Sequence, residues 1–217
     1  MNEKKQIKGD IKYLVQLNEE QKNTKSIIIR SPITIITGRA GSGKSLVCAQ
    51  TALDLIFKKV YKKINVTRSL VEVGETMGFL PGNANDKFNP YMEPIKENLY
   101  NCYDRLKIDS LIQEGVIQAF PVQCARGKTV DEILIIEEAQ NLTQYQMLAV
   151  LTRLGKFGKI IINGDAAQRD IGANMGETGL DYCIRLSKAI PEIIHIKLKE
   201  NHRNDLVGKI LDFEYGN

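Results

Sequence analysis

The sequence predicts an α/β fold: a mostly parallel sheet flanked by helices. Short runs rich in isoleucine and valine alternate with longer helical patterns, which is the order found in parallel α/β domains. The runs show little polar–apolar alternation, as expected of strands that are covered on both faces. The chain has 217 residues, of which 43% are hydrophobic and 26% charged, ordinary values for a globular domain with its own core. We therefore expect a single domain over residues 1–217.

The expected elements cover most of the chain. Strands are predicted at Ile33–Thr37, Ile64–Thr67, Ile117–Phe120, Ile133–Glu137, Ile160–Asn163 and Ile193–Ile196. Helices are predicted at Lys44–Phe57, Asp86–Glu114, Gln144–Leu154, Gly179–Ala189 and Leu206–Phe213. This alternation of strand and helix is what the crossover connections of a parallel sheet require.

Two further segments carry local signals. Gln21 stands three residues after Asn18, which is the spacing of a capping box at the start of a short helix. Proline and glycine residues between Gly74 and Pro94 predict a long loop that enters a helical insertion, over about residues 74–115.

The most informative segment follows the first strand directly. It reads Gly38-Arg-Ala-Gly-Ser-Gly-Lys-Ser45, a G-x-x-x-x-G-K-S motif between a strand and a helix, the context of a phosphate-binding loop. The glycines let successive N–H groups turn onto phosphate oxygens, and the next helix adds a positive N-terminal dipole. Lys44 would reach the β- and γ-phosphates, and the Ser45 hydroxyl would bind Mg²⁺. We expect contacts to a nucleoside triphosphate from Gly38, Arg39, Ala40, Gly41, Ser42, Gly43, Lys44 and Ser45.

Two adjacent acids follow the fourth predicted strand. Four apolar residues lead directly into Glu137 and Glu138. An acid at this end of a strand near a phosphate loop holds the Mg²⁺ hydration shell, and a second acid can orient the attacking water and accept its proton. The pattern therefore predicts Glu137 as a metal residue and Glu138 as the general base, which favours hydrolysis over phosphate transfer to a metabolite. The alternative is two exposed glutamates that cap the following helix.

A polar residue after the next strand is a candidate sensor. The strand that ends at Asn163 leads into Gly164-Asp-Ala-Ala-Gln168. In sheets of this kind the strand after the acidic one commonly lies beside the phosphate-loop strand, which would bring Gln168 close to the γ-phosphate. We expect Gln168 to report hydrolysis to the rest of the protein, and an ordinary polar turn is the alternative.

Five segments, in the same order along the chain, resemble those of one family. The most specific is Val66-Thr-Arg-Ser-Leu-Val-Glu-Val-Gly-Glu-Thr-Met-Gly-Phe-Leu-Pro-Gly82. The others are Asp86-Lys-Phe-Asn-Pro-Tyr91, Ala125-Arg-Gly-Lys-Thr129, Glu138-Ala-Gln-Asn141 and Gly164-Asp-Ala-Ala-Gln168. The chain thus resembles the PhoH family of ATPases, whose core is similar to the first RecA-like lobe of superfamily-one helicases. The resemblance spans roughly Leu17 to Phe213 and implies a RecA-like P-loop ATPase fold.

The resemblance also implies individual roles. Residues 17–21 resemble the helicase Q motif, which implies that Gln21 selects adenine and that ATP is the nucleotide; a plain helix cap is the alternative. Residues 198–204 resemble a helicase motif whose arginine touches the γ-phosphate. Arg203 would then neutralise transition-state charge in its own subunit or a neighbour's, a surface arginine being the alternative. This length leaves room for one lobe and family members are described as hexamers, so we expect a homo-oligomeric ring that completes the site.

The chain departs from the family at two positions. Glu137 stands where the family usually has an aspartate. The extra methylene moves the carboxylate by about 1.5 Å, and Mg²⁺ tolerates poor octahedral geometry badly, so slow hydrolysis is expected unless the backbone compensates. Ser69 replaces a proline, which loosens a turn. No segment matches the endonuclease domain fused to some relatives, so RNA cleavage is not expected.

Basic residues near two strand ends are candidates for contacts to nucleic acid. Thr67 and Arg68 stand at the end of the second strand, and Arg126 and Lys128 lie in a later loop, with tyrosines nearby. Phosphate pairing with base stacking suits single-stranded RNA or DNA without sequence preference. A formal charge of +4 permits this without requiring it. Contacts to ATP or to another subunit are the alternative.

Composition excludes several other classes. The four cysteines form no C-x-x-C pair and there are only two histidines, which argues against a zinc ribbon, a thioredoxin-type site or a histidine-rich metal centre. No apolar run approaches 18 residues and the N-terminus lacks the apolar core of a signal peptide, so we expect a cytoplasmic protein without a membrane span. Two other functions stay open: an ATP-dependent switch that recruits a protein partner, and a nucleoside or nucleotide kinase.

Overall fold

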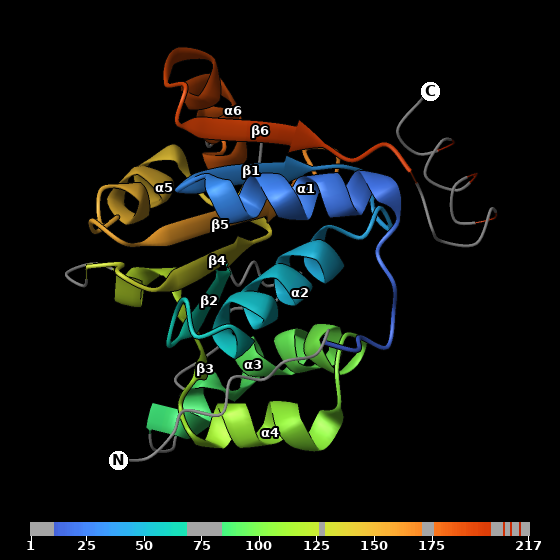
Figure 1. Cartoon of the computed structure of the whole chain (residues 1–217). Coiled ribbons are helices and arrows are strands. Elements are labelled where there is room, and N and C mark those ends of the chain that lie inside the picture. The colour runs from blue at the N-terminus through green and yellow to red at the C-terminus, as the bar shows by residue number, and fades with distance from the viewer. Residues whose placement is uncertain are drawn as a thin grey trace.

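Six parallel strands form the centre of the molecule, with helices on both faces of the sheet (Figure 1). The computed structural model describes residues 11–68, 84–125, 129–170 and 176–200, together with residues 206, 209 and 213; of residues 84–91 it describes the backbone only. The strands are β1 (Ile33–Thr37), β2 (Ile64–Arg68), β3 (Ile117–Pro121), β4 (Ile133–Glu137), β5 (Lys159–Gly164) and β6 (Ile193–Lys197). Each predicted strand is confirmed, with its ends shifted by no more than one residue.

The helices lie mainly between consecutive strands. They are α1 (Glu19–Arg30), α2 (Lys44–Phe57), α3 (Ala84–Tyr100), α4 (Arg105–Gln113), α5 (Gln144–Leu151) and α6 (Gly179–Ala189), with two short 3-10 helices, η1 (Val122–Ala125) and η2 (Ala139–Asn141). The predicted helix at 206–213 lies mostly outside the described residues. No helix in the described part of the chain is long and apolar enough to cross a bilayer.

The strand order is β3-β2-β4-β5-β1-β6 and every neighbouring pair is parallel. β5 lies between β4 and β1, as predicted for the strand that follows the two acids. Because all strands point the same way, the segments that follow β1, β4 and β5 meet at one edge of the sheet, called here the carboxyl edge (Figure 1).

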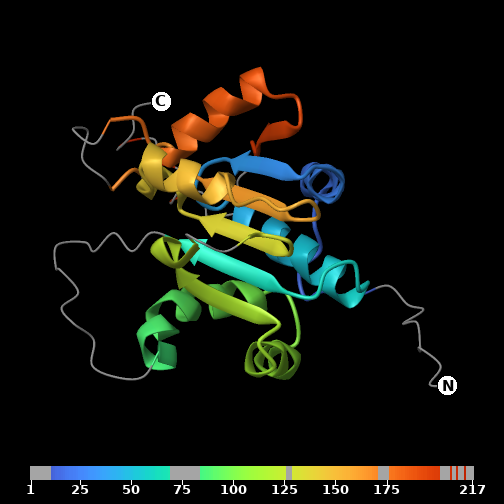
Figure 2. The same cartoon turned by 90° about the vertical axis from the view of Figure 1, so that its left-hand side faces the viewer.

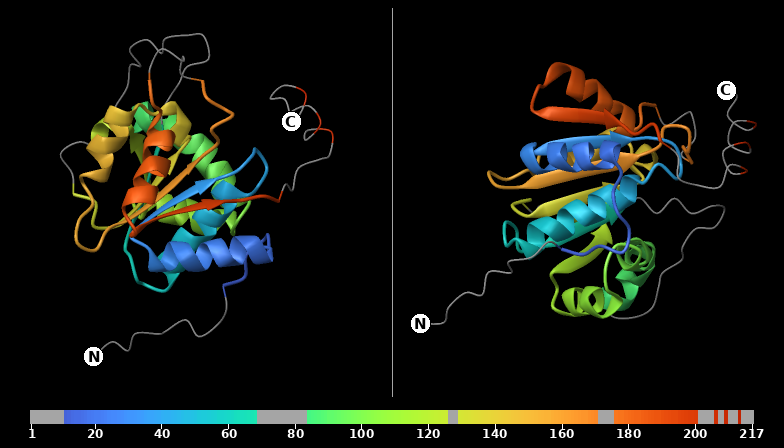
Figure 3. Two further views of the ribbon diagram at one scale, coloured as in Figure 1. Left: turned by 90° about the horizontal axis from the view of Figure 1, so that it is seen from above. Right: turned by 45° about the vertical axis from the view of Figure 1, so that its right-hand side comes forward.

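Alternate side chains of the strands pack into two separate cores. Residues such as Ile36 and Ile135 pack with α1, α2, α3 and α4, whereas Ile35 and Ile136 pack with α5 and α6. Figures 2 and 3 show these two helical layers on opposite faces of the sheet. Burial on both faces explains the near-continuous apolar runs of the strands.

The helical insertion differs from the prediction. Its single predicted helix at 86–114 is wrong, because the chain turns after Tyr100 and starts again as α4. The Asp104 side chain accepts the Lys107 N–H at 2.8 Å and so caps α4. The Tyr103 ring packs on Phe57 and the Cys102 carbonyl accepts an N–H from the N-terminal segment. Contacts to distant parts of the chain therefore fix the break.

Helix α5 ends earlier than predicted, at Leu151 instead of Leu154. The Arg153 carbonyl accepts the Val130 N–H at 2.7 Å, and the Gly155 N–H returns to the Val130 carbonyl at 2.9 Å. Residues 152–155 therefore pair with the segment before β4 instead of continuing the helix.

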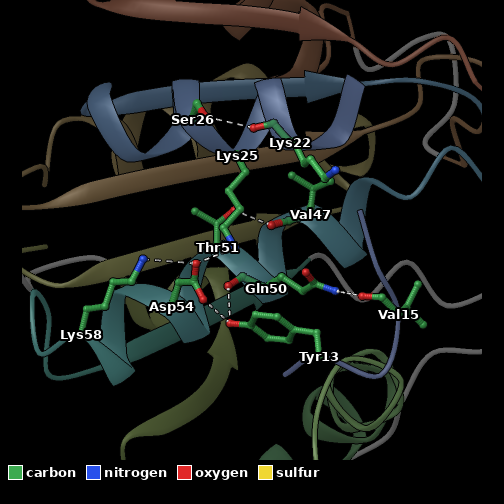
Figure 4. A network of polar contacts seen from close by, with 10 residues as sticks. All are labelled: Tyr13, Val15, Lys22, Lys25, Ser26, Val47, Gln50, Thr51, Asp54 and Lys58. Carbon is green, nitrogen blue, oxygen red and sulfur yellow. Dashed lines mark hydrogen bonds and ion pairs between the residues drawn. The ribbon is translucent and has the colours of Figure 1, made fainter. Parts of the chain in front are cut away.

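A polar network joins α1, α2 and the N-terminal segment (Figure 4). The Asp54 carboxylate lies at its centre, accepting the Tyr13 hydroxyl at 2.6 Å and pairing with the Lys25 ammonium at 2.5 Å. Gln50 donates to the Val15 carbonyl at 2.7 Å. These bonds fix α1 and residues 13–15 against the helix that follows the phosphate loop.

Lys159 is a buried cation at the opposite edge of the sheet. Its ammonium donates to the carbonyls of Ile28 at 2.6 Å and Ser31 at 2.5 Å, which lie at the C-terminal end of α1. Carbonyls at a helix C-terminus attract a positive charge. Burial nevertheless lowers the pKa of Lys159 to about 8.

Candidate nucleotide site

The phosphate loop, residues 38–45, connects β1 to α2 and needs glycine at both of its ends. Gly43 N-caps α2 with a φ of 83°, and an added Cβ would collide with the Gln21 side-chain nitrogen. A Cβ on Gly38 would lie 2.6 Å from the Ser42 hydroxyl and 2.9 Å from the Leu198 carbonyl. Both positions combine a positive φ with a close neighbour, so glycine is required there on steric grounds.

The polar groups of the loop fit an anionic ligand. The Lys44 ammonium lies over the loop and donates to the carbonyls of Gly38 at 2.7 Å and Arg39 at 3.1 Å. The Ser42 hydroxyl is buried and has no hydrogen-bond partner within the described part of the chain. The loop also ends at the positive N-terminus of α2. A cation, an unpaired hydroxyl and a helix dipole together favour a phosphate group.

The two predicted metal residues lie close together. Ser45 and Glu137 line the same cavity, where the Ser45 and Asn163 side chains favour the ionised Glu137 carboxylate, and Arg68 is the register partner of Glu137 on the neighbouring strand. Burial raises the pKa of Glu137; the nearby Arg68 charge opposes this and the adjacent Glu138 adds to it. The effect of the longer glutamate side chain on hydrolysis stays a prediction.

Ser45 and Glu137 therefore fit an Mg²⁺ ion. The described residues contain no group of three or more His, Cys, Asp and Glu side chains arranged to hold a metal. Mg²⁺ characteristically keeps several waters and binds to one or two protein oxygens together with substrate phosphates, so this small donor set suits it.

Glu138 adopts an unusual backbone conformation at the start of η2. Its φ of 52° and ψ of 44° lie in the left-handed region, which costs a non-glycine residue on the order of 1 kcal/mol or more. Its carboxylate accepts a hydrogen bond from Gln140 at 2.6 Å. Helix α5 is capped instead by a capping box of Thr143 and Gln146, so the alternative that the two acids cap this helix is wrong.

Gln140 was not predicted as a site residue, yet it connects the two acidic loops. Its side chain is 1% exposed, and its amide nitrogen donates both to Glu138 and, at 3.1 Å, to the Gln168 carbonyl. Its amide oxygen accepts the Asp165 N–H at 3.0 Å. The predicted Glu138-Ala-Gln-Asn141 run contained the only signal for it. A single buried amide thus links the predicted base to the predicted sensor loop.

A second pair of bonds strengthens this link. Asn141 donates to the Asp170 carboxylate at 2.9 Å and accepts the Asp170 N–H at 2.8 Å. Gln168 lies in the turn between these contacts, half-buried, and its own N–H bonds to the Asp165 carbonyl at 3.0 Å. The segment after β5 is therefore connected to Glu138 through Gln140, and the sensor role of Gln168 stays a prediction.

Gln21 forms the predicted helix cap and also contacts the phosphate loop. Its N–H donates to the Asn18 side chain at 2.7 Å and its side-chain oxygen accepts the Asn18 N–H at 3.1 Å, which completes a capping box. Its amide nitrogen donates to the Ser42 carbonyl at 3.3 Å. The cap is confirmed, and selection of adenine by Gln21 stays a prediction.

The structure describes two of the four residues that were predicted to contact nucleic acid, Thr67 and Arg68. Thr67 is 1% exposed, so its side chain does not reach the surface. Arg68 lies beside Glu137, within the nucleotide site. Arg126, Lys128 and Arg203 lie outside the described residues.

Comparison with known sequences gives a consistent result. A family model described as PhoH-like protein matches residues 13–214. The chain is 33% identical to a PhoH-like protein of Bacillus subtilis, covering 94% of this chain and 70% of that protein. It is 34% identical to a PhoH-like protein of Mycobacterium tuberculosis, covering 88% and 55%, and 34% identical to Protein PhoH2 of Bacillus subtilis, covering 87% and 45%. The chain therefore spans about half the length of several of these relatives.

Solved structures share the fold at low sequence identity. The large terminase of a thermophilic bacteriophage matches with a TM-score of 0.58 at 9% identity, over 94% of this chain and 51% of that one. The same terminase in complex with ADP gives 0.53 at 10% identity, over 92% and 50%. The Pif1 helicase of Candida albicans gives 0.50 at 19% identity, over 91% and 43%. With its RecA-like P-loop NTPase fold and a family match over residues 13–214, the chain belongs to the PhoH-like protein family.

Proposed function

We propose that this chain binds ATP with Mg²⁺ and hydrolyses it, as a homo-oligomer whose activity is coupled to single-stranded RNA or DNA. The hydrolytic part is carried by one observation, the placement of Ser45 of the phosphate loop and Glu137 in the lining of one cavity, with Glu138 next in the chain. Nucleotide binding is supported by the terminase of the same fold that was solved with ADP.

Each residue has a distinct task in this proposal. Lys44 releases the loop carbonyls and pairs with the β- and γ-phosphates, neutralising charge that grows in the transition state. Ser45 and Glu137 hold Mg²⁺, which when bound polarises the phosphate oxygens. Glu138 orients the attacking water and accepts its proton, and Gln140 keeps the Glu138 carboxylate in place.

The test of hydrolysis is the steady-state rate of phosphate release from ATP with Mg²⁺. Lys44→Ala should lower the rate by at least about a hundredfold, because the principal phosphate-binding charge is lost. Lys107→Ala, on the exposed surface of α4, removes a lysine far from the loop and should leave the rate unchanged. Equal rates for the two variants would contradict the proposal.

Coupling to nucleic acid is tested by adding single-stranded RNA, single-stranded DNA or free nucleosides to the same assay. Stimulation by either polymer supports the coupling proposed here. Indifference to both contradicts it and favours a switch. Formation of a phosphorylated nucleoside in step with ADP would identify a kinase.

The switch is a second candidate because of the link between Glu138 and the segment after β5. The bonds of Gln140 and Asn141 give a change at the γ-phosphate a direct route to residues 165–170. In that case the ATP-bound form would recruit a protein partner and hydrolysis would reset it. A pull-down of partner proteins in the presence of ATP tests this switch. Glu138→Gln, which should bind ATP without hydrolysing it, should retain the partner, whereas Lys44→Ala, which lacks the phosphate-binding charge, should not.

Self-assembly rests on the family resemblance. We expect light scattering in the presence of ATP to give a mass several times that of the chain, and a hexamer would match the ring. A monomer both with and without ATP would contradict assembly and leave the ATPase proposal intact.

A further inference from the structure

Three consecutive backbone N–H groups after β6 are held by the nucleotide end of the domain. The Leu198 N–H donates to the Thr37 carbonyl at 2.8 Å, immediately before the phosphate loop. The next two N–H groups donate to one carboxylate, that of Glu20: Lys199 at 3.0 Å and Glu200 at 3.2 Å. Residues 198–200, called here the exit segment, are therefore fixed to both β1 and α1.

A side chain of the exit segment also bonds to α1. The Asn18 side chain, which caps α1, donates to the Glu200 carboxylate at 2.6 Å. The first turn of α1 and the exit segment thus hold each other by backbone and side-chain bonds. Bonds to an ionised carboxylate are stronger than those between neutral groups.

The phosphate loop lies between these two partners. At its end Gln21 of α1 bonds to the Ser42 carbonyl and closely approaches Gly43. At its beginning Leu198, which is buried, packs so closely on Gly38 that no side chain fits there. Glu20 connects the two contacts, because it belongs to α1 and bonds to the exit segment.

We propose that Glu20 is a positioning residue that preorganises the phosphate loop for nucleotide. By tying the exit segment to α1, it holds Leu198 against Gly38 and Gln21 against Ser42, and so keeps both ends of the loop in their binding conformation. The proposal rests on the proposed function for the identity of the ligand. A preorganised loop spends less free energy on ordering when phosphates bind, so Glu20 acts on affinity for ADP and ATP alike.

Glu19 provides a matched control. It lies in the same first turn of α1 and has the same charge, so the helix dipole acts on it as well, but it pairs with Lys22 on its own helix at 2.6 Å. Replacing either acid by alanine changes the net charge and the helix equally. Of these two acids, Glu20 is the one that bonds to the exit segment.

The experiment measures the Kd of ADP and of ATP with Mg²⁺ by titration calorimetry, well below the unfolding temperature, and kcat by phosphate release. Glu20→Ala should raise both Kd values about tenfold and change kcat by less than about twofold. Glu20→Gln retains a side-chain oxygen that can accept the two N–H groups, and should recover most of the affinity. Glu19→Ala should bind like the wild type.

Hydrogen exchange gives a second readout that does not depend on turnover. The amides of Lys199 and Glu200 should exchange slowly in the wild type and in Glu19→Ala, and more slowly still with ADP. In Glu20→Ala they should exchange faster, and ADP should protect them less.

The outcomes are distinct. If the wild type binds no nucleotide, the proposed function fails and this proposal fails with it. If the wild type binds ADP but Glu20→Ala binds it equally well, only the role of Glu20 is overturned. If Glu20→Ala loses thermal stability without any change in Kd, its contacts are structural and the positioning role is also overturned.

Discussion

Two buried carboxylates in this molecule have opposite surroundings. Asp54, between α1 and α2, is 6% exposed and is balanced within the protein by the Lys25 ammonium and the Tyr13 hydroxyl. Glu137, at the end of β4, is 8% exposed and has the neutral side chains of Ser45 and Asn163 beside it. Its charged neighbours are of both signs, Arg68 on one strand and Glu138 next in the chain.

The difference separates an acid that supports the fold from one that supports a ligand. The charge of the buried Asp54 is balanced by amines of the protein itself, Lys25 at 2.5 Å and Lys58 at 3.8 Å. At Glu137 burial is the main cause of a raised pKa, and a second acid beside it adds to the demand for positive charge. Such unbalanced surroundings are typical of functional sites. The nature of the partners, more than burial itself, therefore distinguishes the two roles.

The largest effect that can test this comparison is on turnover. Glu138→Gln should lower the rate of ATP hydrolysis by about a hundredfold or more, because the amide cannot accept a proton from water. The Kd of ATP should change little, since Lys44 and the loop are intact. Phosphate release and calorimetry measure the two quantities. Asp54→Asn is the matched amide on the other side of the comparison and should retain turnover per folded molecule; hydrolysis by Glu138→Gln at the wild-type rate would refute the base assignment.

The second test concerns stability and uses Asp54 itself. Asp54→Asn removes the charge that balances Lys25 and weakens the bond with Tyr13. Loss of one partner of a buried pair is costly, and we expect a loss of about 2–3 kcal/mol, because Lys25 is partly exposed. In a chain of this size that lowers Tm by roughly 5–10 °C, measured by calorimetry. An unchanged Tm would show that the network in Figure 4 contributes little.

The third test also measures Tm, but here the substitution of a buried acid by its amide should raise Tm instead of lowering it. Because the pKa of Glu137 lies above its ordinary value of 4.5, the folded state disfavours the ionised form, and stability is lost as pH rises above that value. Glu137→Gln removes this cost, so it should raise Tm by a few degrees at about pH 7.5, with a smaller gain near pH 4.5. Mg²⁺-dependent hydrolysis should be lost. A lower Tm at neutral pH would mean that the pairing with Arg68 outweighs the cost of burial.

The smallest expected effect concerns Lys159, a buried cation held by carbonyls instead of an acid. With a folded-state pKa of about 8 and an ordinary value of 10.5, it loses its proton in the folded state first, so stability rises with pH between these values. The neutral amine still donates to Ile28 and Ser31. The Tm of the wild type relative to Lys159→Met should therefore increase by a few degrees from about pH 7.5 to about pH 9.5. A constant difference would contradict the lowered pKa.

Local sequence patterns were sufficient for most of the fold. The strands lie where the apolar runs predict them, and α2 and α6 have the predicted bounds, since burial and capping act within a few residues. The break between α3 and α4 was missed, because Tyr103 and Cys102 are held there by Phe57 and the N-terminal segment. Such contacts join residues that are far apart in the sequence and leave no local pattern.

In the site, too, features with a local sequence pattern were predicted, and those that depend on distant contacts were not. The proximity of Ser45 and Glu137 follows from two motifs that the sequence displays. Gln140 and Glu20 were not identified, because an amide and a surface-type acid acquire their roles only from partners on other elements. Arg68 was assigned to nucleic acid from its position after a strand, and only the register with β4 revealed its proximity to Glu137.

The buried amide of Gln140 has a consequence for regulation. It bonds at once to Glu138 and to the backbone of the segment after β5, so displacing either of them breaks a bond to the side chain that also holds the other. Thermodynamic linkage makes such coupling reciprocal. A partner that binds residues 165–170 and displaces them must alter the affinity for nucleotide by the same factor by which the nucleotide alters the affinity for that partner. Effector control of such a site thus needs no separate relay beyond one side chain.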